Sequence, residues 1–293
     1  MNWSDIGYHG WTDLDKVRAV LAAGADPDAD NGWPGPALHQ AAERGSPEVV
    51  AELARRVADV DALHDVATAL WRAVAARQPD NARILAAAGA DPLRDMMSGW
   101  SPARLSLTGP TPDLFGATTS LTDDEAETVR ESHRLIALFD DLDYEGLGLA
   151  CVAGIDAAEA VRRINATVVE PESTDDLSIM WATDVPGGCV IAQPWGYAPT
   201  GSELTVPLSA GTTCYDLYAN PKSGDQGDIV RDGEIIGSDL HPGGGVDPDD
   251  ENPLLSYLYE DAPVAYCFAF AGLRPTDTRA VTGPPDLWIR VPA

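Results

Sequence analysis

The sequence predicts an α-helical solenoid followed by an α+β domain with a mostly antiparallel sheet. Three observations predict this fold class: similar segments recur about every 33 residues, the recurrence stops near residue 146, and short apolar runs typical of strands follow. We therefore divide the chain into a repeat array over residues 1–106, a linker and connecting helix over 107–145, and an acidic α+β domain over 146–293.

The recurrence is clearest at Ala-Asp pairs, which begin at residues 25, 58 and 90 and are thus 33 and 32 residues apart. Between the first two pairs, apolar spacing predicts two helices, 36–44 and 47–54. Gly45 is expected to end the first helix in a left-handed conformation, and Ser46 to cap the second, with Pro47 at its first position. A further helix is expected at 14–22, and a Thr-x-x-Glu capping box predicts another at 122–139.

Residues 30–54 resemble the ankyrin consensus, because a turn is followed by Pro-Ala-Leu-His-Gln-Ala-Ala, then glycine, then Glu-Val-Val-x-x-Leu. The resemblance extends over residues 11–106 and is most specific in the two middle units. It implies an ankyrin-type solenoid in which His39 ties a helix to a turn. The acids from Asp26 to Asp30 are then expected to form a turn, although they resemble the start of a calcium loop.

The ankyrin resemblance also implies where a partner would bind. Hairpin tips and the exposed sides of the first helices form a concave face in such arrays, and Trp and Arg are frequent anchors at interfaces. The alternative is that the tryptophans only cover the ends of a short solenoid. The candidate partner-binding residues are Asp30, Trp33, Gln40, Arg44, Arg72, Arg77 and Trp100.

The C-terminal part has strand patterns in place of the repeat. Asp156 is expected to cap a short helix, and Asp232-Gly233 to form a tight hairpin turn. Strands are predicted at 147–153, 177–183, 189–193, 212–219, 228–231, 234–238, 264–270 and 287–291.

Residues 146–291 resemble an uncharacterised actinobacterial domain family. The resemblance rests on Gly187–Ile191, Trp195–Tyr197, Leu208–Thr212, Tyr218–Asn220 and the Asp232-Gly233 turn. That family implies no activity for this domain.

The formal net charge is −28, and it is concentrated in the C-terminal part. Residues 1–110 hold 15 acidic and 10 basic residues, whereas 111–293 hold 32 and 9. Such a charge disfavours nucleic acid and anionic membranes as partners and attracts basic proteins, although it also serves solubility. With no long apolar run and no signal-peptide pattern, we expect a cytoplasmic protein.

No sequence motif assigns a catalytic residue, a metal site or a cofactor. Four widely separated cysteines are expected to be buried thiols, and the acids at 247–251 beside His241 to form an exposed loop. The leading hypothesis is a non-catalytic, cytosolic protein-interaction protein that binds a partner through its array. One alternative is an immunity protein or antitoxin that neutralises a basic toxin, and another is an enzyme with an unrecognised site in the C-terminal domain. The oligomeric state stays open.

Overall fold

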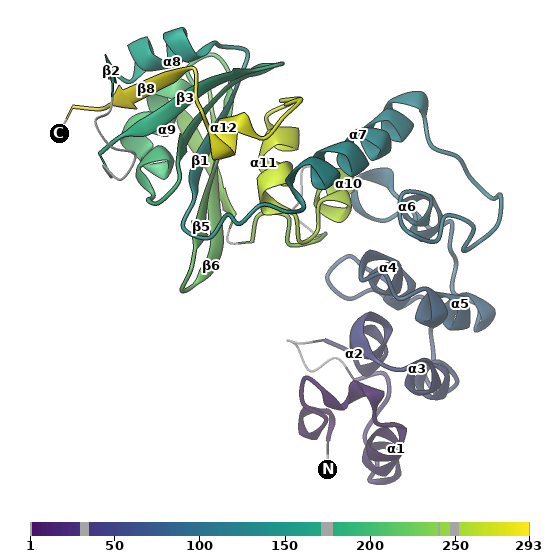
Figure 1. Ribbon diagram of the computed structural model, residues 1–293. Coiled ribbons are helices and arrows are strands. Elements are labelled where there is room, and N and C mark those ends of the chain that lie inside the picture. The colour runs from purple at the N-terminus through teal and green to yellow at the C-terminus, as the bar shows by residue number, and fades with distance from the viewer. Residues whose placement is uncertain (1, 30–34, 171–177, 240, 247–251, 293) are drawn as a thin grey trace. The chain divides into compact units, whose positions relative to one another are not determined.

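A computed structural model describes residues 2–29, 35–170, 178–239, 241–246 and 252–292. The chain forms two compact units (Figure 1). The first consists of residues 1–127 and 245–258, and the second of residues 128–244 and 259–293. A short segment from late in the sequence therefore belongs to the N-terminal unit. The domain limits at residues 106 and 146 stay predictions.

The first unit is an array of short helices. Its elements are η1 Trp3–Asp5, η2 Gly10–Thr12, α1 Leu14–Ala22, α2 Ala37–Arg44, α3 Pro47–Ala54, α4 Ala69–Ala75, α5 Pro79–Ala87, η3 Met97–Gly99, α6 Pro102–Ser106 and α10 Pro253–Leu258. One layer holds α2, α4 and α6, and the other holds α1, α3 and α5, as Figure 1 shows. The helices predicted at 14–22, 36–44 and 47–54 are confirmed to within one residue.

The recurring aspartates connect the hairpins of successive repeats. The Asp28 carboxylate accepts a hydrogen bond from the Ala58 amide at 2.9 Å, and the Asp61 carboxylate accepts one from the Asp91 amide at 3.1 Å. In each hairpin a second aspartate accepts a hydrogen bond from the backbone N–H two residues later, which stabilises the turn. These residues are Asp26, Asp59 and Asp91. The predicted turn is thus confirmed for Asp26 and Asp28, whose carboxylates bind backbone amides.

Buried polar groups also hold neighbouring repeats together. The Asn81 side chain of α5 donates to the carbonyl oxygens of Ala42 and Gly45, at 3.1 and 3.0 Å. His39 is buried, and its Nε2 lies 3.2 Å from the Ala67 carbonyl oxygen. Burial lowers the pKa of His39 to about 4, so the ring is neutral at pH 7 and Nε2–H donates to that oxygen. The expected structural role of His39 is confirmed.

Two predictions about the junction between α2 and α3 were wrong. Gly45 has a φ of −89°, which is not left-handed. Glycine is needed there for space, because a Cβ would lie 2.6 Å from the Ala41 carbonyl oxygen. Ser46 occupies the N-cap position, but its side chain makes no capping hydrogen bond. Its backbone oxygen instead accepts from the amides of Val49 and Val50.

The second unit is built on one antiparallel sheet, which has eight strands within the described residues. The strands are β1 Gly148–Ala153, β2 Thr167–Val169, β3 Met180–Val185, β4 Gly188–Gln193, β5 Thr213–Asn220, β6 Gly224–Arg231, β7 Glu234–Asp239 and β8 Leu287–Arg290. Their order across the sheet is β2-β8-β3-β4-β1-β5-β6-β7. The predicted α+β class is confirmed.

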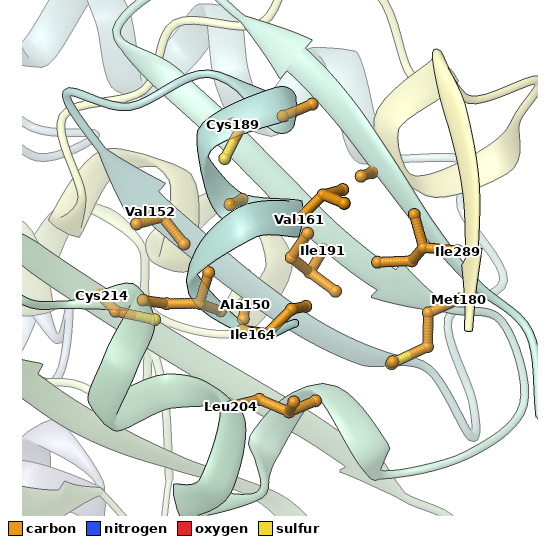
Figure 2. Packing of buried hydrophobic residues seen from close by; sticks show 14 of the residues in the cluster. Ala150, Val152, Val161, Ile164, Met180, Cys189, Ile191, Leu204, Cys214 and Ile289 are labelled. Carbon is orange, nitrogen blue, oxygen red and sulfur yellow. The ribbon is translucent and has the colours of Figure 1, made fainter. Parts of the chain in front are cut away.

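Helices cover both faces of this sheet. They are α8 Ala157–Arg163, η4 Ala198–Thr200, α9 Ser202–Leu208, α11 Pro263–Phe270 and α12 Arg279–Thr282. Figure 2 shows the core beneath α8 and α9, where Val161, Ile164 and Leu204 meet the strand residues Ile191 and Met180. Helix α11 packs on the opposite face through the Tyr215 ring, since side chains of a strand alternate between faces.

The strand predicted at 264–270 was wrong, because this segment is helix α11, Pro263–Phe270. Most of its residues are buried, so it shows no polar face, and a short apolar run does not distinguish a buried helix from a buried strand. The hairpin turn is confirmed, with φ of 52° at Asp232 and 84° at Gly233. The capping box is also confirmed at helix α7, Asp123–Phe139, where Thr122 and Glu125 each bond the other's backbone amide.

Candidate protein-binding surface

A cavity of about 590 Å³ opens at the N-terminal end of the array. The segments around η1 and η2 form one wall. The loop after α1, which we call the first hairpin, forms a second wall with Ala25, Asp26 and Ala29, and helix α2 forms a third. We call it the N-terminal cavity, and its lining residues are Asn2, Trp3, Ser4, Gly7, Tyr8, Trp11, Ala25, Asp26, Ala29, Gly35, Gln40 and Arg44. Gln40 and Arg44 are four residues apart and so share one face of α2.

Contacts within the chain hold the aromatic wall of the N-terminal cavity in place. The Trp3 and Trp11 rings are stacked with centroids 6.1 Å apart. The Trp3 indole N–H donates to the backbone oxygen of Asp26 at 2.7 Å, which joins the wall to the first hairpin. The Arg44 guanidinium lies 4.5 Å from the centroid of the Tyr8 ring, in a cation–π arrangement. Tyr8 is nonetheless 67% exposed, so a large aromatic surface stays open to a partner.

A row of alternating charges runs from the cavity towards the second repeat. Arg44 pairs with Glu43, and the other oxygen of Glu43 lies 3.6 Å from an Arg72 nitrogen. Arg72 in turn lies 3.9 Å from the Asp65 carboxylate. Each arginine is only partly exposed, so these pairs restrain its guanidinium more than fully exposed ion pairs would. The row gives the first-helix layer fixed positive groups beside the aromatic wall.

Of the seven residues predicted to bind a partner, the five that the structure describes lie in different places. Gln40 and Arg44 line the N-terminal cavity, and Arg72 extends the charged row on α4. Asp30 and Trp33 lie outside the described residues. Their role in partner binding therefore stays a prediction.

Arg77 and Trp100 make contacts inside the first unit. The Arg77 guanidinium donates to the Tyr257 carbonyl oxygen at 2.6 Å and lies over the Tyr257 ring at 5.1 Å. Trp100 is only 7% exposed, and the Arg104 guanidinium covers its ring at 4.7 Å. Both side chains thus stabilise the array, and we omit them from the proposed surface.

Sequence reasoning missed the three aromatic residues that line the cavity. Trp3, Tyr8 and Trp11 precede the first complete repeat unit, which starts near residue 30, so no consensus position predicted a role for them. One signal was available, because three of the first eleven residues are aromatic in a chain with 7% aromatic residues.

The four cysteines are free and buried, and burial raises the pKa of each thiol. They are therefore protonated and unreactive at pH 7. Among the described residues, no group of three or more His, Cys, Asp or Glu side chains could hold a metal ion. The acids at 247–251 lie outside those residues. No helix in the described part of the chain is both long and apolar enough to cross a membrane.

Comparison with known proteins identifies the N-terminal region. Residues 8–95 match a family model described as ankyrin repeats, in three copies. No curated protein matches the chain. The resemblance of residues 146–291 to an uncharacterised domain family stays a prediction. With the two-layer packing and the inter-repeat aspartate bonds, this match identifies residues 8–95 as three ankyrin repeats.

Proposed function

We propose that this protein is a non-catalytic interaction protein whose ankyrin array holds a protein partner at the N-terminal cavity. In this proposal one or two side chains of the partner enter the cavity between Tyr8 and α2. The charged row from Arg44 to Arg72 then contacts the partner beside that anchor point. The proposal combines the usual role of ankyrin repeats in protein–protein interaction with the composition of this particular surface.

The observation that carries the proposal is the ordered aromatic wall next to an arginine. Trp, Tyr and Arg dominate the residues that contribute most to protein interfaces, and such residues cluster in well-packed pockets. Here Trp3 is held by a hydrogen bond to Asp26, and Arg44 is held by Tyr8 and Glu43. Because these groups are ordered before a partner arrives, less conformational entropy is lost on binding.

The net charge of −28 supports a basic partner as the finer form of this proposal. A strongly acidic protein attracts basic proteins over distances longer than a contact and so raises the rate of encounter. Neutralisation of a basic toxin is one biological role that this form would explain. If the partner is basic, its association with this protein should slow as the salt concentration rises, because exposed charges are screened beyond about 8–10 Å at physiological ionic strength.

Site-specific photo-crosslinking in native cells tests the location of the partner. One variant carries the photoreactive amino acid at Tyr8, and the matched control carries it at Tyr197, which lies in the second unit and is equally exposed at 69%. The proposal expects one protein to be crosslinked from position 8 and not from position 197. Crosslinking of the main partner from position 197 alone would contradict it.

The identified partner then allows a quantitative test. Arg44→Glu should weaken its affinity by about tenfold or more, as expected for loss of an interface arginine. Arg83→Glu is the matched control, because Arg83 lies exposed in the second-helix layer and pairs only with Asp80 among the contacts described. Equal losses from both substitutions would show a general charge effect and not a specific cavity contact. For a basic partner, the association rate should fall with salt while the dissociation rate changes little.

A further inference from the structure

The second unit contains a polar cavity of about 400 Å³ at one end of its sheet. Strands β5, β6 and β7 form its floor, and the turn that leads into η4 forms its rim. We call it the acidic groove. Its lining residues are Tyr197, Thr200, Asp216, Tyr218, Asn220, Gln226, Gly227, Asp228, Ser238 and Asp239.

Strand pairing brings the polar side chains of the groove into one row. The register of β5 and β6 pairs Tyr215 with Ile229 and Tyr218 with Gln226, which places Asp216 opposite Asp228. The register of β6 and β7 pairs Asp228 with Ser238. Opposed residues of antiparallel strands share a face and lie within side-chain contact distance. Two carboxyl groups and a hydroxyl therefore cross three strands side by side.

Asp216 is buried, at 1% exposure, and is only half satisfied. Its Oδ1 accepts a hydrogen bond from the Asp228 amide at 3.0 Å, whereas its Oδ2 has no hydrogen-bond partner among the described residues. Burial raises the pKa of Asp216 to about 8, and the negative charge of Asp228 adds to this effect. Burying a carboxyl oxygen without a hydrogen-bond partner costs free energy of folding, so Oδ2 is suited to bind a polar group of a ligand.

The composition of the groove indicates the charge of that group. None of the described lining residues is basic, so nothing in the wall balances the charge of Asp228, or the charge that Asp216 gains when it loses its proton. The Tyr197 and Tyr218 rings meet edge to face with centroids 5.8 Å apart, and Tyr197 is exposed at the rim. The Asp228 carboxylate repels anions, and a neutral polyol would leave its charge unbalanced. A cation would meet the Asp228 carboxylate and the Asp216 carboxyl, which loses its proton to solvent as the cation binds, and would lie beside the two lining tyrosines.

We propose that the acidic groove binds a small organic cation with a primary ammonium or guanidinium head, held by Asp216 and Asp228 beside Tyr197 and Tyr218. This site lies in the second unit and is independent of the N-terminal cavity. Neither the ankyrin repeats nor the proposed protein partner requires it.

The protonation of Asp216 makes this proposal specific. At pH 7 the unliganded carboxyl holds a proton, and a bound cation favours the carboxylate, so binding releases a proton. The apparent affinity should rise about tenfold per pH unit from pH 6 towards pH 8 and become constant above that. Among the described residues, the other titratable groups that line the groove or interact with Asp216 are carboxyl, thiol and phenol groups, and burial holds the thiols protonated over this range. They are Cys151 on β1, Cys214 and Tyr218 on β5, Asp228 on β6, Asp239 on β7, Tyr197 at the rim and Cys267 on α11.

Isothermal titration calorimetry of the full chain with agmatine and putrescine tests the proposal, with glucose as the neutral probe. Saturable binding of either cation is expected. The heat should differ between buffers of low and high ionisation enthalpy at pH 7, as proton release requires. Three results would each overturn the proposal: no cation binding up to about 10 mM, tighter binding of glucose than of either cation, or cation binding without proton release.

Asp216→Asn should weaken cation binding at pH 8 at least tenfold and abolish proton release, because the amide keeps the Oδ1 acceptor but carries no charge. Asp232→Asn is the matched control, since Asp232 is exposed at the β6–β7 turn, where asparagine before glycine is well tolerated. It should bind as the wild type does. If Asp216→Asn does not fold, Tyr197→Ala at the exposed rim gives a second test and should weaken binding severalfold. Unchanged binding in the folded variant used would overturn the proposal.

Discussion

The packing of the array is tested most directly by Leu53→Ala. Leu53 is fully buried, and it lies on α3, the helix that contacts α1, α2 and α5. Burial of a whole leucine side chain contributes about 1.5–3 kcal/mol, and the cavity left by the substitution adds to the loss. We therefore expect the free energy of unfolding of the array to fall by about 2–5 kcal/mol, with the lower value if neighbouring residues collapse into the space.

Leu93→Ala is the matched control, because the same change is made in the same array at a side chain that is 50% exposed. It leaves no closed cavity, so we expect a loss of about 1 kcal/mol or less. Urea unfolding followed by far-UV circular dichroism measures both free energies, and hydrogen exchange of peptides from residues 37–87 assigns them to the array. A loss below about 0.5 kcal/mol for Leu53→Ala, or equal losses for both variants, would refute the packing argument.

Three further substitutions test particular contacts of the array. Asp61→Ala removes the acceptor for the Asp91 amide and should reduce the free energy of unfolding by about 1 kcal/mol; an unchanged urea midpoint would show that this inter-repeat bond contributes nothing. Gly45→Ala should cost about 1–3 kcal/mol through the clash of its Cβ with a backbone oxygen, and a variant as stable as wild type would mean that the junction relaxes freely. The hydrogen bond from Arg18, with further contributions from Arg55 and Arg56, lowers the pKa of buried Glu52. The ionised Glu52 side chain therefore stabilises the fold above its unfolded pKa of 4.5, and this stabilisation is lost as pH falls through the lower pKa of the folded state. Wild type should therefore exceed Glu52→Gln in stability at about pH 7 and lose that advantage at about pH 3, and a difference independent of pH would contradict the assignment.

The sequence by itself determined the elements whose signals are local or periodic. The spacing of the Ala-Asp pairs identified the array because each repeat must place the same small residues and turn acids against the next one. The helices at 14–22 and 47–54 followed from apolar spacing and from Pro47. The turn at Asp232 was predictable because aspartate before glycine favours the two positive φ values that a tight hairpin requires.

The tertiary structure alone decided the features that depend on distant residues. Helix α11 was mistaken for a strand because it is buried nearly all round and shows no amphipathic period. The packing of α10 in the first unit, where its Tyr257 accepts from Arg77, joins residues 180 positions apart and has no local signal.

Neither candidate site could be predicted in full from the sequence, because each combines side chains from separate elements. Gln40 and Arg44 could be named from their repeat positions, but the aromatic residues that line the same cavity precede the first complete repeat unit. Asp216 was one acid among 47 acidic residues until strand register placed it opposite Asp228 and burial left one oxygen unpaired. Local sequence determines backbone conformation through short-range sterics and apolar spacing. Which side chains share a cavity is determined by the packing of whole elements, and therefore by the fold.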